Sequence, residues 1–118
     1  ARRINTKSLH ICGNTTKILD LITESETNLF SMDYKVDLNT AREELSGKVA
    51  FGGQLDPIRV LLEGTTSEIE AESLACVRAG GAPGFVLMPG CDIAPKTKLA
   101  NVQTMIHTAH HFDVEEII

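Results

Sequence analysis

The sequence predicts an α/β fold in which four consecutive strand–helix units build a parallel sheet. Four short runs rich in Val, Ile, Leu and Phe recur along the chain, and each is followed by a polar turn and a longer segment of helical periodicity. Continuously apolar strands that alternate with helices are typical of parallel sheets with right-handed crossovers, covered on both faces. The predicted strands are residues 9–12, 29–32, 49–51 and 85–88.

The first two predicted helices begin at capping side chains and carry apolar stripes. Residues 14–16, Asn-Thr-Thr, supply caps for the first helix, and Asp37 caps the second, which ends at Gly47. The stripes consist of Ile18, Leu19 and Ile22 in the first helix and of Leu38, Ala41 and Leu45 in the second. Both helices therefore follow their strands directly, as a βα unit requires.

The third unit contains two helix starts and the fourth contains one. Asp56 is an N-cap with Pro57 at the first helical position, and this short helix stops at Gly64. Thr65 and Glu68 form a capping box that opens a second helix, which runs to residues 80–81. The predicted apolar face of this second helix holds Ile69, Ser73, Cys76 and Val77. The last helix is predicted to begin at Thr97 and to carry Leu99, Val102, Ile106 and Ala109.

The number of units bears on the domain organisation. A spacing of about 20 residues between the first three strands fits successive βα units of a (β/α)₈ barrel or a doubly wound sheet. A complete barrel takes roughly 250 residues, so four units in 118 residues correspond to half of one. Because no linker or second composition zone interrupts it, 1–118 is predicted to be a single domain. Residue 1 is Ala, so we expect a cut or processed piece of something longer.

Composition narrows the class of protein. The formal net charge is -5, with scattered basic residues, which argues against a nucleic-acid partner. The apolar runs are far shorter than the roughly 18–20 residues that cross a bilayer, so we expect no membrane association. Three cysteines without a secretory segment argue against a disulfide framework and for a reducing compartment. We therefore expect a soluble cytoplasmic protein.

A histidine and two cysteines occupy strand ends. His10 and Cys12 lie two residues apart at the end of the first predicted strand, so their side chains point to the same side. Cys91 follows the fourth strand, and in α/β folds the C-terminal strand ends hold the active site. One imidazole and two thiolates form a catalytic zinc set with an open fourth position. The alternative is a core histidine and two small buried cysteines.

Other reactive side chains have simpler interpretations. Cys76 lies on an apolar helix face and is predicted to be a packed core thiol. His107, His110 and His111 include an i,i+4 pair that could bind a metal, but a solvated helix face is the favoured interpretation. Asp33 ends the second strand at the same mouth as the zinc candidates. Its carboxylate could orient a ligand histidine, contact substrate or cap a loop.

Four strings of the sequence carry a resemblance. They resemble the C-terminal part of the uroporphyrinogen decarboxylase superfamily. The strings are L-H-I-C-G-N-T at 9–15, S-M-D at 31–33, G-Q-L-D-P at 53–57 and G-C-D-I-A-P-K-T at 90–97. Within this superfamily, the H-x-C with a late G-C is similar to the zinc-dependent methylcobamide:coenzyme M methyltransferases. The decarboxylases typically carry His-Gly where Cys91-Asp92 stands here. Gln54 replaces the usual Asn, and the family's N-terminal half is absent.

The resemblance implies a fold and an activity. The fold is the C-terminal half of a TIM barrel, with zinc ligands His10, Cys12 and Cys91 and a candidate catalytic residue, Asp33. The implied enzyme of methanogenesis transfers a methyl group from a methylcobamide on a partner corrinoid protein to a small thiol such as coenzyme M. The alternatives are a metal-independent tetrapyrrole decarboxylase and a non-catalytic fragment.

The open sheet adds two expectations about the 118 residues alone. The first and fourth strands leave unpaired edges, so a homodimer through these edges is expected unless the strands flatten into an open sheet. In a flattened sheet, three strand spacings would hold His10 and Cys91 about 14 Å apart. A shared metal therefore requires barrel-like curvature, and the isolated chain is expected to be inactive.

Overall fold

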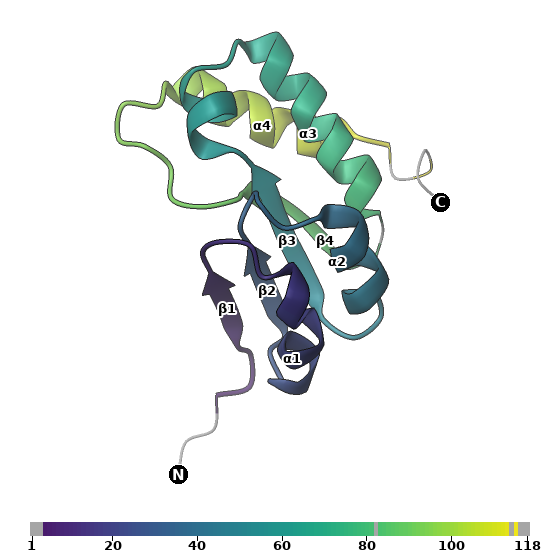
Figure 1. Cartoon of the computed structure of the whole chain (residues 1–118). Coiled ribbons are helices and arrows are strands. Elements are labelled where there is room, and N and C mark those ends of the chain that lie inside the picture. The colour runs from purple at the N-terminus through teal and green to yellow at the C-terminus, as the bar shows by residue number, and fades with distance from the viewer. Residues whose placement is uncertain (1–3, 82, 114, 116–118) are drawn as a thin grey trace.

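The computed structural model describes residues 4–81, 83–113 and 115. Its strands are β1 (Ser8–Ile11), β2 (Leu29–Met32), β3 (Ala50–Leu55) and β4 (Phe85–Pro89), and they form one sheet in the order β1-β2-β3-β4 (Figure 1). All three neighbouring pairs are parallel. The predicted α/β class with four βα units is thus confirmed, and β1 and β4 are the edge strands of the described sheet.

Helices connect the strands and pack in a row. They are α1 (Leu19–Glu24) after the 3₁₀ turn Thr16–Ile18, α2 (Leu38–Leu45), the π-helical segment η2 (Pro57–Leu62), α3 (Thr66–Gly80) and α4 (Leu99–His111). α1 contacts α2, α2 contacts α3, and α3 contacts α4 (Figure 1). Right-handed crossovers between sequential parallel strands place their helices on the same face of the sheet, as on the outside of a TIM barrel.

The core lies between this helical layer and one face of the sheet. Phe30 and Met32 in β2 are fully buried, whereas Ser31 between them is half-buried. On β1, Leu9 packs against the core while His10 is exposed. The expectation that both faces are covered is therefore wrong for the described chain, because β1 and β2 alternate in burial. The open face corresponds to the inner side of a barrel, and it carries His10 and Ser31.

Two predicted helix starts are confirmed in detail. The Asp56 carboxylate accepts hydrogen bonds from the amides of Ile58 and Arg59, at 2.9 and 3.0 Å. Thr65 and Glu68 form both bonds of the capping box, side chain to backbone in each direction. These two caps could be predicted because a cap depends only on residues within one helical turn. Asp37 also stands at the N-cap position of α2, as predicted, but its side chain makes no cap hydrogen bond.

Strand ends differ by a few residues from the prediction. β3 runs on to Leu55, so Gly52, Gly53 and Gln54 lie within the strand and not in a turn after it. β1 ends at Ile11, so Cys12 is the first residue of the following loop. A Cβ on Gly52 would meet the flexible end of the Met88 side chain of β4 and, at 3.0 Å, the carbonyl oxygen of Val86.

The buried face of α4 was predicted incorrectly. Leu99 is 70% exposed and Ile106 is 46% exposed, while the buried residues are Asn101, Met105 and Thr108. Asn101 is buried because its amide donates to the carbonyl of Leu61, at 2.7 Å. The helix also starts one residue later than predicted, with Lys98 at the N-cap position in place of Thr97, and no side chain caps it.

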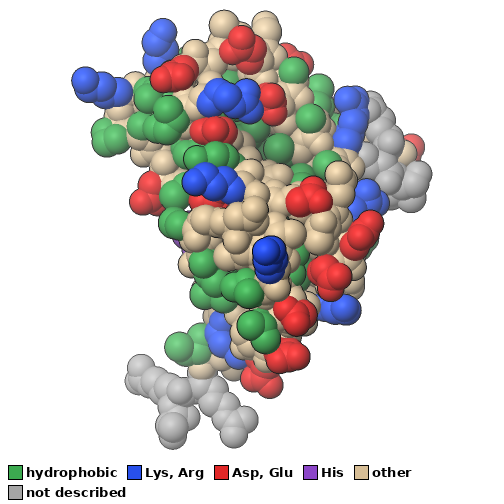
Figure 2. All heavy atoms as spheres, in the orientation of Figure 1, with side chains coloured by type: hydrophobic (Ala, Val, Ile, Leu, Met, Phe, Trp, Pro, Cys, Tyr) green, Lys and Arg blue, Asp and Glu red, His purple; other side chains and the backbone are tan. Residues whose placement is uncertain are grey.

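Surface charge and helix length complete the description. On the face seen in Figure 2, acidic and basic side chains are intermixed over the helical layer. Among the described residues, no helix has both the length and the hydropathy needed to span a membrane.

Candidate metal centre

The orientation of His10 is fixed by the neighbouring strand. His10 pairs with Ser31 in the β1–β2 register, and its Nδ1 lies 2.9 Å from the Ser31 carbonyl oxygen and 3.0 Å from the Ser31 hydroxyl. A carbonyl oxygen only accepts, so Nδ1 carries the proton and donates. The lone pair of the neutral ring is then on Nε2. This nitrogen points at Cys12, with 3.3 Å between Nε2 and Sγ.

Cys12 and Cys91 meet although they follow opposite edge strands. Their Sγ atoms are 3.5 Å apart. The flat arrangement, with about 14 Å between these strand ends, is therefore not adopted. The sheet curves as in a barrel and brings the ends of β1 and β4 together. Among the residues that the structure describes, His10, Cys12 and Cys91 are the one group of three metal-ligating side chains whose ligand atoms all lie within 4.8 Å of one another.

The donor set fits zinc. In a tetrahedral zinc site the zinc–sulfur and zinc–nitrogen bonds are about 2.3 Å and 2.0–2.1 Å long. The ligand atoms of such a site then lie about 3.6–3.8 Å from one another. The distances of 3.3 Å between nitrogen and sulfur and 3.5 Å between the sulfurs are within about 0.3 Å of those values. Three protein ligands on an exposed edge leave the fourth position accessible. The residues present therefore suit a catalytic site better than a closed structural one.

The surroundings of the Cys12 thiol favour its protonated form, and part of this effect comes from nearby negative charges. The pKa of the Cys12 thiol is raised above its ordinary value of 9.0, first by its hydrogen bond with Cys91 and then by desolvation. The negative charges of Cys91, Asp33 and Asp92 raise this pKa further. A bound divalent cation would reverse this effect. It would stabilise the thiolate and displace the thiol proton.

Asp33 lies behind the cluster and supports a loop. Its side chain is 4% exposed, and one carboxylate oxygen accepts from the amide of Gly13 at 2.9 Å. The other oxygen accepts from the amide of Lys35 at 2.8 Å. Gly13 follows Cys12 directly, so Asp33 holds the loop that carries this cysteine. Of the three roles considered for Asp33, these two hydrogen bonds correspond to capping a loop, whereas His10 is oriented by Ser31.

The supporting roles of Ser31, Gln54 and Gly90 were not predicted from the sequence, although Gln54 was noted there as a departure from the family's usual Asn. Ser31 orients His10, as described above. Gln54 donates to the carbonyls of Asp33 and Val36, at 3.3 and 2.7 Å, and so fixes the loop after β2. A Cβ on Gly90 would collide with the backbone of Tyr34, so this glycine allows the loop before Cys91 to pack on the β2–α2 loop. Strand register could have suggested Ser31, since it lies directly beside His10.

A small open pocket adjoins the cluster. Its volume is about 290 Å³, and its wall is partly apolar, with one carboxylate. The lining residues are His10, Ser31, Met88, Pro89, Cys91, Asp92 and Ile93. A small molecule bound in this pocket would therefore lie directly beside two of the three candidate ligands, His10 and Cys91.

The remaining predicted residues lie elsewhere. Cys76 is 9% exposed in α3, and burial raises the pKa of its thiol, which agrees with a packed core cysteine. His107, His110 and His111 are exposed on α4, as predicted, and do not belong to the cluster.

Comparison with known proteins gives relatives of two kinds. The methylcobamide:CoM methyltransferase MtbA of Methanosarcina mazei is 38% identical over 104 residues, which are 88% of this chain and 30% of that protein. The same enzyme of Methanosarcina acetivorans is 35% identical over the same shares. The uroporphyrinogen decarboxylase of an Arthrobacter species is 29% identical over 111 residues, covering 91% of this chain and 32% of the relative.

A solved structure resembles the fold. A methyltransferase from Methanosarcina mazei superposes with a TM-score of 0.81 and 29% sequence identity, over 91% of this chain and 31% of that one. The chain thus spans about a third of the length of the relatives it matches. The profile of the family described as uroporphyrinogen decarboxylase (URO-D) matches residues 2–112. This match covers nearly the whole chain, and the chain therefore belongs to the uroporphyrinogen decarboxylase family.

Proposed function

We propose that this chain belongs to a zinc-dependent methyltransferase that moves a methyl group from a methylated corrinoid protein to a small thiol such as coenzyme M. The observation that carries the proposal is the convergence of His10, Cys12 and Cys91, with all three ligand atoms within 4.8 Å. The relatives named methylcobamide:CoM methyltransferases support the reaction class. The activity is assigned to a larger barrel, of which these residues form a part.

The chain supplies ligands and their positioning. His10, Cys12 and Cys91 would hold zinc, which supplies Lewis acidity that converts a substrate thiol into a nucleophilic thiolate at neutral pH. Ser31 keeps the His10 lone pair directed at the site. Asp33 holds the Cys12 loop through the Gly13 amide, so its role is positioning.

The pocket beside the ligands would hold the acceptor thiol. It opens between β1 and β4, next to His10 and Cys91. Met88 and Ile93 line it, and their apolar side chains would contact the bound thiol. Transfer to a thiol requires the methyl donor to approach the sulfur in line. The open face of the mouth would therefore also be the docking surface for the corrinoid protein.

The second candidate, a metal-independent tetrapyrrole decarboxylase, is supported by the relative from Arthrobacter. Two thiols 3.5 Å apart beside an imidazole favour the methyltransferase, because a metal-independent reaction has no use for this donor set. A non-catalytic fragment is the third candidate. Zinc content distinguishes the first two candidates, and an activity assay distinguishes an enzyme from a fragment.

The test is metal analysis of the purified chain, since the three ligands all lie within it. We expect one zinc per chain in the wild type and a loss of zinc in Cys12→Ala and Cys91→Ala. Cys76→Ala is the matched control, because this cysteine is remote in the core. Unchanged zinc in both ligand variants would refute the proposed site.

A second measurement addresses the reaction. In the full-length protein, X-ray absorption should show an additional sulfur neighbour of zinc when coenzyme M is added. A spectrum unchanged at saturating thiol would favour the decarboxylase or a structural metal.

A further inference from the structure

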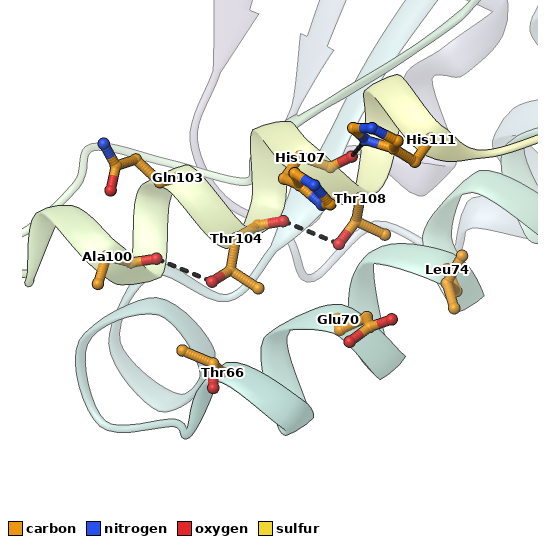
Figure 3. A pocket seen from close by; sticks show the side chains of 9 residues that line it. All are labelled: Thr66, Glu70, Leu74, Ala100, Gln103, Thr104, His107, Thr108 and His111. Carbon is orange, nitrogen blue, oxygen red and sulfur yellow. Dashed lines mark hydrogen bonds between the residues drawn. The ribbon is translucent and has the colours of Figure 1, made fainter.

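We propose that His107 and His111 on α4 form a second metal site, which binds one divalent transition-metal ion such as Cu²⁺ or Ni²⁺ at the groove between α3 and α4. The proposal is independent of the methyltransferase assignment, because neither histidine belongs to the thiol cluster. It rests on the geometry of the ring pair, on the hydrogen bond that fixes one tautomer, and on the groove that the rings border (Figure 3).

The two rings are adjacent. Residues four apart lie on one face of a helix, and the ring centroids of His107 and His111 are 3.9 Å apart with an angle of 21° between the ring planes. Figure 3 shows the two imidazoles side by side on the last turns of α4. Two histidines at this spacing are a known helical chelate geometry. Since histidine χ2 is broad, exposed rings can turn from parallel to convergent around an ion.

A hydrogen bond prepares His111 as a ligand. Its Nδ1 lies 2.9 Å from the carbonyl oxygen of His107, which can only accept. Nδ1 therefore carries the proton, and the lone pair of the neutral ring is on Nε2. Metal-bound histidines in proteins usually have this arrangement, with the second ring nitrogen donating to a carbonyl or carboxylate.

The groove supplies space and charge of the right sign. It has a volume of about 450 Å³ and is lined from α3 by Thr66, Glu70 and Leu74. Glu70 brings a carboxylate to the wall facing the histidine helix (Figure 3). The hydroxyls of Thr104 and Thr108 donate to carbonyls of their own helix at 2.8 Å. Of the other polar side chains by which α4 lines the groove, the two imidazoles and the Gln103 amide, the imidazoles are the stronger ligands for a transition metal.

The ligand set selects the class of ion. Among the described residues, the histidine pair has no third ligand atom at the spacing found in the thiol cluster. Water would complete the coordination. Imidazole suits Zn²⁺, Ni²⁺ and Cu²⁺, and Cu²⁺ is the strongest binder of the divalent series. A cation at the last turn of α4 also interacts favourably with the negative end of the helix dipole.

The test uses untagged protein in a Cys12→Ser/Cys91→Ser background, so that the thiol cluster cannot compete. Calorimetric titration with Cu²⁺ should give one site per chain. His107→Ala and His111→Ala should each weaken binding by tenfold or more, which corresponds to about 1.4 kcal/mol. Glu70→Gln should weaken it by less, because its carboxylate contributes charge at a distance.

The matched control is His110→Ala, an exposed histidine of the same helix that does not line the groove. It should bind Cu²⁺ like the background. Circular dichroism of each variant verifies that α4 is intact. The proposal would be overturned if His107→Ala and His111→Ala bound Cu²⁺ as tightly as the background does, or if His110→Ala lost as much affinity as they do. Because the background lacks both thiols, neither result depends on whether the proposed methyltransferase site exists.

Discussion

At His10, the position of the ring proton determines which nitrogen can bind a metal. Nδ1, which faces Ser31, carries the proton, so Nε2, which faces Cys12, is free to bind. Nδ1 donates to the Ser31 carbonyl, and the Ser31 hydroxyl adds a second contact at 3.0 Å. The strand-end pattern of the sequence predicted that His10, Cys12 and Cys91 lie at the same end of the sheet, but their contact depends on the curvature of the sheet. Ser31 could not be identified in this way, because its role depends on the register between two strands.

Removal of the Ser31 hydroxyl should weaken zinc binding moderately. Ser31→Ala keeps the backbone carbonyl that fixes the His10 tautomer, so we expect a loss of about tenfold, at the lower end for partners of metal ligands. Competition with a chelator measures this affinity. His10→Ala should lose far more, and a Ser31→Ala variant with the same loss as His10→Ala would contradict the positioning role.

Cys76 gives a prediction about stability and pH. Burial raises the pKa of its thiol above 9.0 in the folded chain, so the folded state favours the protonated form. Its contribution to stability is therefore fully present below pH 9 and is lost as the pH rises above 9. Cys76→Ala should cost about 1 kcal/mol or somewhat more at pH 7 and should reduce the loss of stability in alkali. Urea unfolding at pH 7 and pH 10 measures both effects, and an identical pH dependence in the two proteins would contradict the prediction.

Among the elements, α4 shows where sequence periodicity is insufficient. Two adjacent stripes run along this helix, one apolar with Leu99 and Ile106 and one mixed with Asn101 and Met105. The mixed stripe is buried because Asn101 satisfies the Leu61 carbonyl at the end of η2. A partner 40 residues away in the chain cannot be read from local spacing, whereas the caps at Asp56 and Thr65 could be.

A pair of substitutions on α4 distinguishes the two stripes. Asn101→Ala leaves the carbonyl of Leu61 without this donor in a buried position, which should cost about 1–3 kcal/mol. Leu99→Ala removes a side chain that is 70% exposed and should change stability by less than about 0.5 kcal/mol. Thermal or urea unfolding compares the two variants. The reverse order would show that the apolar stripe is the buried one in solution.

For the whole molecule, the curvature of the sheet is the property that creates the site. The four apolar runs predicted a parallel sheet, but not whether it would be flat or curved. In the structure, the ends of β1 and β4 are close enough for their following cysteines to lie 3.5 Å apart. The curvature also leaves the inner face of the described sheet partly open, with Val86 of β4 at 43% exposure. The curvature of the sheet thus brings the three ligands together. Within the described chain, β1 and β4 each still have one edge without a neighbouring strand.

The isolated chain should therefore bind zinc, associate through its edges and fail to transfer methyl groups. An unpaired edge of apolar strand favours pairing with another chain, and a lysine on an edge strand opposes it. We expect sedimentation to show dimers whose population rises with concentration, and Val86→Lys to shift the chain toward monomer while zinc content stays the same. Catalysis should be absent in both, because the pocket of about 290 Å³ is open where a complete barrel would enclose the acceptor. A strictly monomeric wild type with one tightly bound zinc and full methyl transfer would show that four βα units are sufficient, and that neither edge pairing nor barrel closure is needed for the reaction.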